Sequence, residues 1–405
     1  MATVHPFPAL RPAPESAALV SAVPYDVVNT EEARRLAAGN PLSFLHVSRP
    51  EIDLPAGTDP HADEVYRRGA ENFEILKRDA PLVAEGRSGI YVYRLRAGDH
   101  EQTGIGACCS IDEYDTDVIR KHERTRRDKE DDRTRHMIEL SAQTGPVFLT
   151  YRDLPAANFL VEKTKAEPPL YDFTAEDRVR HTVWRMGEDD GRSLVQAFTD
   201  VPCFYIADGH HRAASASRAR QHFRSLNPAD RKGLNEFDYF LSVLFPASQV
   251  RILPYNRIVR DLNGLSPEEL LTKLRKKFSV AEEAPASPAR RGEISMYLGG
   301  RWYGLVPPES ASDELDVTTL QDAVLSPILG VHDIRTDKRI DFVGGGRGTS
   351  ELEKMVDSGA AAAAFSLYPV SLDQLMAISD ANEMMPPKST WFEPKLRDGL
   401  LVHLI

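Results

Sequence analysis

Cysteine is scarce in this sequence, which has only Cys108, Cys109 and Cys203 among 405 residues. Three cysteines cannot form a disulfide framework, and none belongs to a Cys-x-x-Cys pair of the kind that binds zinc. No apolar run approaches the ~20 residues of a membrane span, and no basic segment followed by an apolar block indicates a secretory signal. We therefore expect a soluble, cytoplasmic protein with reduced thiols and no membrane partner.

Basic residues are also in deficit. Lysine and arginine number 50 against 61 aspartate and glutamate residues, which gives a formal net charge of −11. A protein that lives on DNA needs clustered basic side chains to displace counterions, whereas the basic stretches here are interleaved with carboxylates. Nucleic acid is therefore not expected as the main partner. A repeat of fixed period is absent too, which argues against a solenoid.

What is present is an alternation of strand-like and helix-like segments. In the first part, we expect strands at 90–95, 103–109, 147–151, 182–186, 203–207 and 239–245, and helices at 111–120, 131–142, 193–199 and 213–222. In the last part, we expect a hairpin at 293–305, strands at 340–343 and 361–368, and a helix at 349–357. This order predicts an α/β or mixed α+β fold.

A stretch rich in proline and charge, residues 281–292, is the best candidate for a linker. It leaves a region of at least domain size on each side. The sequence therefore predicts an N-terminal and central α/β region at 1–280 and a C-terminal α/β region at 293–405.

The most informative segment is Asp208-Gly209-His210-His211-Arg212, which follows an apolar strand and precedes an alanine-rich helix. Such a turn places free backbone N–H groups at a helix N-terminus, where the macrodipole favours an anion. Gly209 lets the backbone approach a ligand closely, and Arg212 can add a bidentate contact to phosphate. His210 and His211 can donate to a phosphoryl oxygen or move a proton. The alternative is that Asp208 caps the helix and the histidines are exposed.

This segment resembles the Gly-x-x-Arg turn of the ParB/sulfiredoxin-like superfamily, which includes nucleotide-binding partition proteins and free-serine kinases. In those relatives the turn embraces nucleotide phosphates. The resemblance implies a ParB/sulfiredoxin-like phosphate-binding core with additional α/β regions, in which Gly209, His210, His211 and Arg212 contact phosphates of ATP or ADP. Sulfiredoxins carry a cysteine in this turn, and partition proteins carry a helix-turn-helix module. This chain shows neither, so redox chemistry and DNA partitioning are not implied.

Nearly the whole chain resembles the bacterial family catalogued as domain of unknown function 1015. The matching stretches are Pro6-Phe7 to Arg11-Pro12, Pro24 to Val28, His122 to Thr125, Lys129 to Arg133, Ala207 to Arg212 and Pro386 to Phe392. This resemblance specifies a family and little chemistry. The activity implied by the more distant superfamily is that of a kinase acting on a small hydroxy compound such as serine.

A second candidate is the charged segment from Lys121 to Arg133. Arg126 stands where a His-Glu-x-x-His zinc motif would need its second histidine, so that motif is excluded. A solvated helix with i,i+4 ion pairs is one interpretation of such a segment. In the functional interpretation, His122 and Glu123 supply a general base.

The same segment also carries the charges that phosphoryl transfer requires. That reaction needs cations for the phosphates, a carboxylate for Mg²⁺ and an acceptor for the proton of the nucleophile. The functional interpretation therefore assigns phosphate contacts to Lys129 and Arg133, and a Mg²⁺ contact to Asp132.

Three further places invite a functional interpretation. Asp26 follows the rigid dipeptide Pro24-Tyr25, so it can point a carboxylate into a cleft or cap the next turn. The glycine run 344–348 lacks both the dinucleotide-binding spacing and a P-loop lysine, so we expect a turn there. The loop 386–392 has the composition of a ligand-contacting loop, although its aromatic residues can instead pin the chain to the core.

Together these features favour a nucleotide-dependent phosphotransferase that uses ATP or ADP with Mg²⁺. In this hypothesis the turn holds the phosphates, and Glu123 or Asp26 deprotonates the acceptor. Two alternatives stay open: a nucleotide-binding regulator without catalysis, and a phosphohydrolase that uses His210 or His211. The ligand expected in each case is a small phosphate-bearing molecule, and the sequence is compatible with a homo-oligomer.

Overall fold

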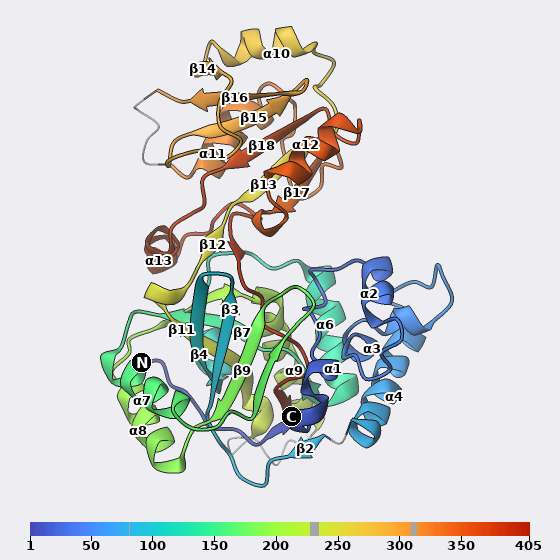
Figure 1. Cartoon of the computed structure of the whole chain (residues 1–405), viewed down its shortest axis with the longest axis vertical. Helices are drawn as coiled ribbons and strands as arrows, with labels where there is room; N and C mark the ends of the chain where they lie inside the picture. The colour runs from blue at the N-terminus through green and yellow to red at the C-terminus, as the bar shows by residue number, and fades with distance from the viewer. Residues whose placement is uncertain (81, 227–234, 309–313) are drawn as a thin grey trace. The chain divides into compact units, whose positions relative to one another are not determined.

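The chain forms two compact units in the computed structural model, which describes residues 1–80, 82–226, 235–308 and 314–405. The first unit comprises Met1–Val250 together with Pro394–Ile405, and the second comprises Arg251–Glu393. The first unit is thus discontinuous in sequence, because the second is inserted before its last residues. Both chain ends lie in the first unit (Figure 1).

An eight-stranded mixed sheet dominates the first unit, in the order β5-β10-β7-β11-β4-β3-β9-β8. Its strands are β3 (Tyr91–Ala97), β4 (His100–Ser110), β5 (Ile119–Arg120), β7 (Val147–Tyr151), β8 (Tyr171–Thr174), β9 (Arg180–Arg185), β10 (Phe204–Asp208) and β11 (Tyr239–Pro246). Strand β10 pairs parallel with β5, and β11 pairs parallel with β7. The strand β10 that leads into the predicted phosphate turn therefore lies near one edge of this sheet, hydrogen-bonded on both sides.

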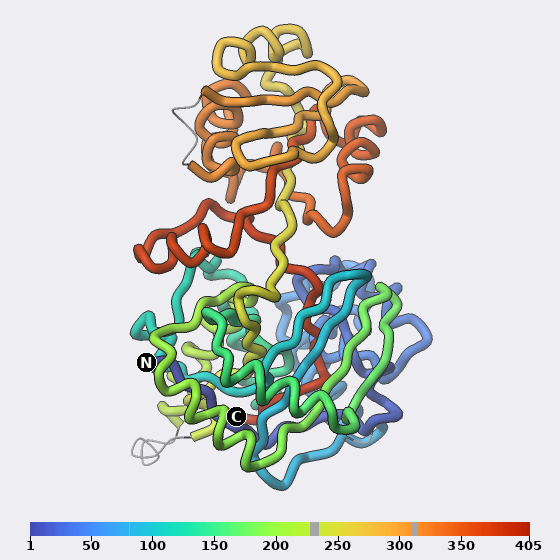
Figure 2. Tube along the Cα trace, turned by 60° about the vertical axis from the view of Figure 1, so that its left-hand side comes forward, coloured from blue at the N-terminus to red at the C-terminus, as the bar shows by residue number. Residues whose placement is uncertain are grey.

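A smaller sheet joins the two ends of the chain. Its order is β2 (Val83–Ala84), β1 (Ala9–Arg11), β20 (Val402–Leu404) and β6 (Ala142–Gln143). The C-terminal strand β20 is an inner strand, since it pairs with both β1 and β6. Figure 2 shows the last residues of the chain, drawn in red, running within the first unit.

The helices of the first unit fall into two groups. They are α1 (Ala17–Val20), α2 (Thr30–Ala37), α3 (Leu45–Ser48), α4 (Asp63–Asp79), α5 (Ile111–Asp115), α6 (Arg127–Leu140), α7 (Pro155–Lys165), α8 (Glu188–Phe198) and α9 (His210–Leu226). Helices α2, α3, α4 and α6 lie together, and α6 also packs along α9 (Figure 1). Helices α7 and α8 pack against each other, and α7 contacts β3 and β9. No helix in the described part of the chain is long and apolar enough to cross a membrane.

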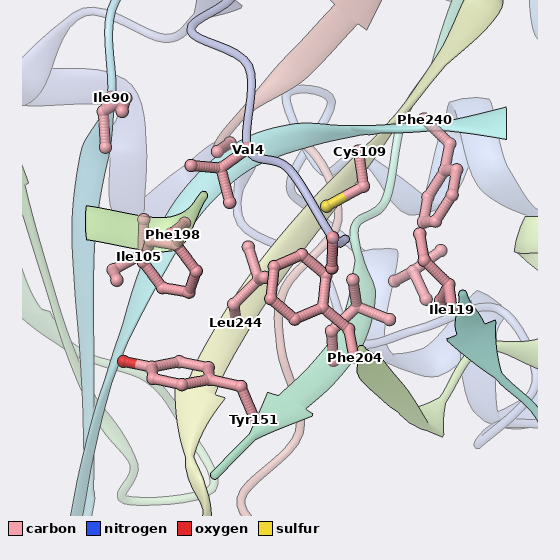
Figure 3. Close-up of a cluster of buried hydrophobic side chains, with 14 of the residues drawn as sticks. Val4, Ile90, Ile105, Cys109, Ile119, Tyr151, Phe198, Phe204, Phe240 and Leu244 are labelled. Atoms are coloured by element: carbon pink, nitrogen blue, oxygen red, sulfur yellow. The ribbon is translucent and has the colours of Figure 1, made fainter. Parts of the chain in front are cut away.

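The main core forms where alternate strand residues meet helices. Tyr151, Phe198 and Phe204 are buried and contact one another with ring centroids 5.0–6.5 Å apart (Figure 3). The first half of helix α9 contributes small side chains to this cluster, since Ala213, Ala216 and Ala219 are buried in it. Small residues let α9 approach β7 and β11 closely, which brings its first turn down onto the sheet.

The second unit is built on a six-stranded sheet, in the order β14-β16-β15-β18-β13-β17, in which every pair is antiparallel. The strands of the whole unit are β12 (Ile252–Leu253), β13 (Tyr255–Val259), β14 (Ser279–Glu282), β15 (Ile294–Leu298), β16 (Arg301–Val306), β17 (Ile340–Gly344), β18 (Ala363–Leu367) and β19 (Trp391–Phe392). Its helices are α10 (Pro267–Leu274), α11 (Asp316–Leu320), α12 (Thr349–Asp357) and α13 (Leu372–Asp380). Strands β12 and β19 form a separate pair, so this unit begins and ends on neighbouring strands.

The α/β class predicted from the sequence is confirmed, and the strands lie close to their predicted ranges. Two segments differ. Residues 111–120 form the short helix α5 and the strand β5, because Asp117 takes a left-handed φ of 59° that ends the helix. The helix expected at 193–199 begins earlier, at Glu188 of α8, where carboxylates of the first turn complement the helix dipole. The ParB/sulfiredoxin-like core stays a prediction.

The boundary between the compact units lies at Val250, whereas the stretch 281–292 was predicted as the linker. Residues 281–292 lie inside the second unit, where 281–282 end β14 and 283–292 lead towards β15. Proline and charge are typical of exposed connections within a domain as well as between domains, so composition alone does not separate the two cases.

Gly399 offers a test of how tightly the C-terminal segment is packed. It has a φ of 84°, and a Cβ there would lie 2.5 Å from the Phe44 ring. We expect Gly399→Ala to lower the free energy of unfolding by about 2 to 4 kcal/mol, measured by urea denaturation. Gly187→Ala is the control, because a Cβ there would meet no atom within 4 Å and its φ is −60°. Equal stability of the two variants would contradict the packing described here.

Candidate functional site

The predicted turn has the geometry of a strand that passes directly into a helix. Strand β10 ends at Asp208, and α9 begins at His210. Gly209 between them has a φ of 90°, and its carbonyl accepts the first helical hydrogen bond, from the Ala213 N–H at 3.1 Å. The N–H groups of the first turn thus have no acceptor within the helix. A left-handed φ here explains why glycine occupies this position.

Asp208 does not cap the helix in the way the alternative interpretation expects. Its carboxylate accepts a hydrogen bond from the Gly209 N–H at 2.8 Å and another from the Lys395 ammonium at 2.7 Å. Partial burial disfavours the charged carboxylate, but Lys395, the Gly209 N–H and Arg212 outweigh it and lower the pKa of Asp208 to about 2. Asp208 is therefore a fixed negative charge at the mouth of the turn.

Arg212 is held inside the protein by an ion pair. Its guanidinium donates to the two carboxylate oxygens of Asp398 at 2.9 and 3.3 Å, and to the Pro146 carbonyl at 3.3 Å. Arg212 is 9% exposed and Asp398 is 2% exposed. A Cβ on Gly145 would collide with the guanidinium, so that glycine makes room for the pair. Arg212 thus has fewer donors left for a ligand than the sequence analysis assumes.

The two histidines of the turn hold a neighbouring segment. The Nε2 atom of His210 accepts a hydrogen bond from the His122 N–H at 3.4 Å, and their rings meet edge to face at 4.5 Å. The Nε2 atom of His211 accepts from the Arg126 N–H at 3.0 Å. The two candidate segments, 122–133 and 208–212, therefore meet in space, and the histidines make the connection.

The buried imidazoles of His122 and His210 are neutral at physiological pH. Burial lowers the pKa of His122 to about 4, against a smaller opposing effect of its hydrogen bond to the Ile206 carbonyl. Burial, together with the neighbouring His122, lowers the pKa of His210 well below its ordinary value. Neutral rings that form hydrogen bonds with backbone groups position the chain, and they are poorly suited to exchange protons near pH 7.

Tyr25 links the two candidate segments a second time. The guanidinium carbon of Arg133 lies 4.1 Å from the centroid of the Tyr25 ring, and that of Arg212 lies 5.6 Å from it. Both distances are within the range of cation–π attraction. Tyr25 is buried, and burial raises its pKa. The ring thus holds one arginine from each segment.

A narrow cleft of about 20 Å³ opens at the turn, and Pro24 and Pro146 form part of its wall. Its polar lining consists of Asp26, Asp208, Gly209, Arg212 and Lys395. The side chain of Asp26 is exposed, so its carboxylate is accessible from the cleft. The structure therefore brings the predicted base Asp26 next to the predicted phosphate turn.

A larger cavity of about 210 Å³ borders Tyr25 on the side of Arg133. Its charged lining contains two ion pairs, Arg49 with Glu51 at 2.9 Å and Arg133 with Asp132 at 2.8 Å. Lys129 also lines the cavity and makes no ion pair with any residue that the structure describes. One positive charge is left after the pairs are matched, so this cavity favours an anion.

Asp132, the predicted Mg²⁺ ligand, is already engaged. One carboxylate oxygen accepts from the Tyr66 hydroxyl at 2.8 Å, and the other accepts from Arg133 at 2.8 Å. Burial disfavours its charge, but Arg133 outweighs it and the pKa of Asp132 falls to about 2. Within the described residues, no group of three His, Cys, Asp or Glu side chains could hold a metal ion. The residues present thus do not fit a dedicated Mg²⁺ site, and Mg²⁺ binding by Asp132 stays a prediction.

Some predicted residues lie apart from these cavities. Glu123 and His122 are absent from the described lining of both. The glycine run 344–348 and the loop 386–392 belong to the second unit, where the Trp391 ring packs so closely on Gly344 that a Cβ would lie 2.6 Å from it. This contact accounts for glycine at 344 and agrees with the expectation that Trp391 pins the chain.

Sequence reasoning missed Lys395 and Asp398, which supply the partners of Asp208 and Arg212. Lys395 lies 187 positions from Asp208 along the chain, and Asp398 lies 186 positions from Arg212. Neither residue stands in a recognisable motif. An ion pair of such long range leaves no local signal, and only the fold shows it.

Acid denaturation tests the assignment of Asp132 as the buried partner of Arg133. Because the pKa of Asp132 is lowered in the folded state, its ionised form stabilises the fold above pH ~4, and that stabilisation is lost as the pH falls towards about 2. We expect the free energy of unfolding to fall by about 2 kcal/mol more in the wild type than in Asp132→Asn over this range, measured by urea denaturation. Parallel acid profiles for the two proteins would contradict the assignment.

Comparisons with known proteins place the chain in a family. Distantly similar solved structures include a free serine kinase in complex with AMP (14% identity, 71% of this chain and 86% of that chain, TM-score 0.35). They also include SbnI with C-terminal truncation from Staphylococcus aureus (12% identity, 74% and 87%, TM-score 0.40). No curated protein matches the chain. The family described as "Protein of unknown function (DUF1015)" matches residues 4–322, so the chain belongs to this family, as the sequence resemblance predicts.

Proposed function

We propose that this protein is a nucleotide-dependent phosphotransferase, which moves a phosphoryl group from ATP or ADP to a small hydroxy metabolite such as serine. One observation carries the proposal: the 122–133 segment and the 208–212 turn meet at Tyr25, beside the exposed carboxylate of Asp26. Phosphoryl transfer depends on positioned cations and an acceptor for the proton of the nucleophile. Here Lys129 and Arg133 line the larger cavity, and Asp26 lines the narrow cleft.

The phosphate contacts follow from the geometry of the turn. The first N–H groups of α9 point out of the helix end and favour an anion there. Lys129 adds an ammonium in the larger cavity, and Arg133 adds a guanidinium that Asp132 and Tyr25 hold in place. Arg212 contributes chiefly by fixing the start of α9, because both terminal nitrogens of its guanidinium already donate to the Asp398 carboxylate. The resemblance of the turn to the Gly-x-x-Arg turn supports the assignment of these groups to nucleotide phosphates.

Asp26 is the general base in this proposal. Its carboxylate takes the proton of the acceptor hydroxyl while the hydroxyl oxygen bonds to phosphorus and the bond from phosphorus to the leaving nucleotide oxygen breaks. Glu123 is the weaker candidate, since it does not line either cavity. Mg²⁺, when bound with the nucleotide, would neutralise phosphate charge, and it would rely mainly on phosphate oxygens and water for its ligands.

The phosphohydrolase alternative gives a direct chemical role to His210 or His211. Both rings instead accept backbone hydrogen bonds from the 122–126 segment, which supports a positioning role. A nucleotide-binding regulator without catalysis has the same binding site but no turnover. Measurement of turnover therefore separates that alternative from the proposal.

A matched pair of variants tests the proposal, with ATP or ADP as donor and L-serine as the first acceptor. We expect Asp26→Asn to lower turnover by about 100-fold or more while nucleotide affinity stays within about twofold, because only the base is removed. Glu123→Gln should keep turnover near that of the wild type. Product nucleotide and phosphorylated acceptor are measured by chromatography, and affinity by calorimetry.

The outcomes discriminate clearly. Loss of turnover in Glu123→Gln with full activity in Asp26→Asn would exchange the roles of the two carboxylates. Nucleotide binding by the wild type without turnover of any hydroxy acceptor would favour the regulator. A wild type that binds neither nucleotide would refute the proposed function.

A further inference from the structure

Lys395 reaches the cleft from the far end of the chain. It belongs to Pro394–Ile405, the segment that returns to the first unit after the second unit is complete (Figure 2). The residues that follow it are firmly placed: Leu400 and Leu401 are buried, and Asp398 forms the ion pair with Arg212. The position of the Lys395 ammonium is therefore set by the core and not by a mobile tail.

The ammonium stands where a ligand at the turn would meet it. Its Nζ atom lies 2.7 Å from the Asp208 carboxylate, and the side chain lines the same narrow cleft as Asp26 and Gly209. The Lys395 side chain is 15% exposed and that of Asp208 is 40% exposed, so the pair faces the cleft.

The charges of the cleft show why a second cation matters. Asp26 and Asp208 are both carboxylates, and the charge of Arg212 is matched by Asp398. With Arg212 and Asp398 matched, Lys395 offsets one of the two remaining negative charges, and without it both carboxylates would repel a nucleotide phosphate. A lysine ammonium is a compact charge on a flexible stem with three donors, so it can contact a carboxylate and a phosphate oxygen together.

We infer that Lys395 is a phosphate-binding residue of the first unit, contributed in cis by the C-terminal segment. The inference rests on the proposed function, since it assigns Lys395 to the phosphates of the same nucleotide. When the nucleotide binds, the Lys395 ammonium stays between the turn and the phosphate, and Asp208 orients the ammonium. The cleft is thus incomplete in residues 1–250 alone.

Calorimetric titration with ADP and with adenosine tests this inference on the full-length chain. We expect Lys395→Met to weaken ADP binding by about tenfold or more, as the loss of a charge-assisted hydrogen bond does, and to leave adenosine binding within about twofold. Lys395→Arg, which keeps the charge, should bind ADP within about fivefold of the wild type. Lys163→Met is the matched control, because Lys163 also forms an ion pair, with Asp190 at 2.8 Å, but lines neither cavity.

The results separate the inference from the proposed function. A wild type that binds no ADP and no ATP overturns both. If the wild type binds ADP and Lys395→Met binds it as well as Lys163→Met does, the inference alone fails. Equal weakening of ADP binding and adenosine binding would indicate a structural role for Lys395 and would also overturn the inference. If Lys395→Met melts at a lower temperature without ligand, Lys395→Gln replaces it in the same comparison.

Discussion

The buried ion pair between Arg212 and Asp398 is the interaction on which the site of the first unit depends. Burial raises the pKa of Asp398 to about 6, against the opposing pull of Arg212, so the charged pair exists only because its two-armed geometry offsets the loss of water. The pair joins the first turn of α9 to the end of the chain. It also holds Arg212 near Tyr25, and through Tyr25 it reaches Arg133 on α6.

The histidines of the turn show how a chemically suggestive motif can have a structural use. Two adjacent histidines beside a phosphate turn invite roles as proton donors. In the folded chain each ring accepts a backbone hydrogen bond, and burial keeps His210 neutral. The proposed function therefore assigns the chemistry to carboxylates and ammonium groups, of which Asp26 and Lys129 line the cavities with the fewest partners among the residues that the structure describes.

Local patterns in the sequence were sufficient for the elements and for the strand-turn-helix geometry of the candidate site. The apolar run before Asp208, the glycine and the alanine-rich helix define a strand, a turn and a helix, and the structure has all three. The meeting of the 122–133 segment with that turn depends on how α6 packs along α9, which no spacing in the sequence encodes. Lys395 and Asp398 were missed for the same reason, because their partners are remote. The linker was misplaced because proline and charge mark exposed chain wherever it occurs.

The discontinuity of the first unit has a consequence for how the protein is made. Synthesis supplies residues 1–250 first, then the whole of 251–393, and only then the segment that contains β20. While the ribosome is adding the second unit, the first unit still lacks an inner strand of its small sheet and the carboxylate that neutralises Arg212. The second unit, which is continuous, can close its core earlier. The unit that starts first is therefore the one that finishes last, and the cleft that Lys395 lines cannot assemble until the segment from Pro394 onward has been added.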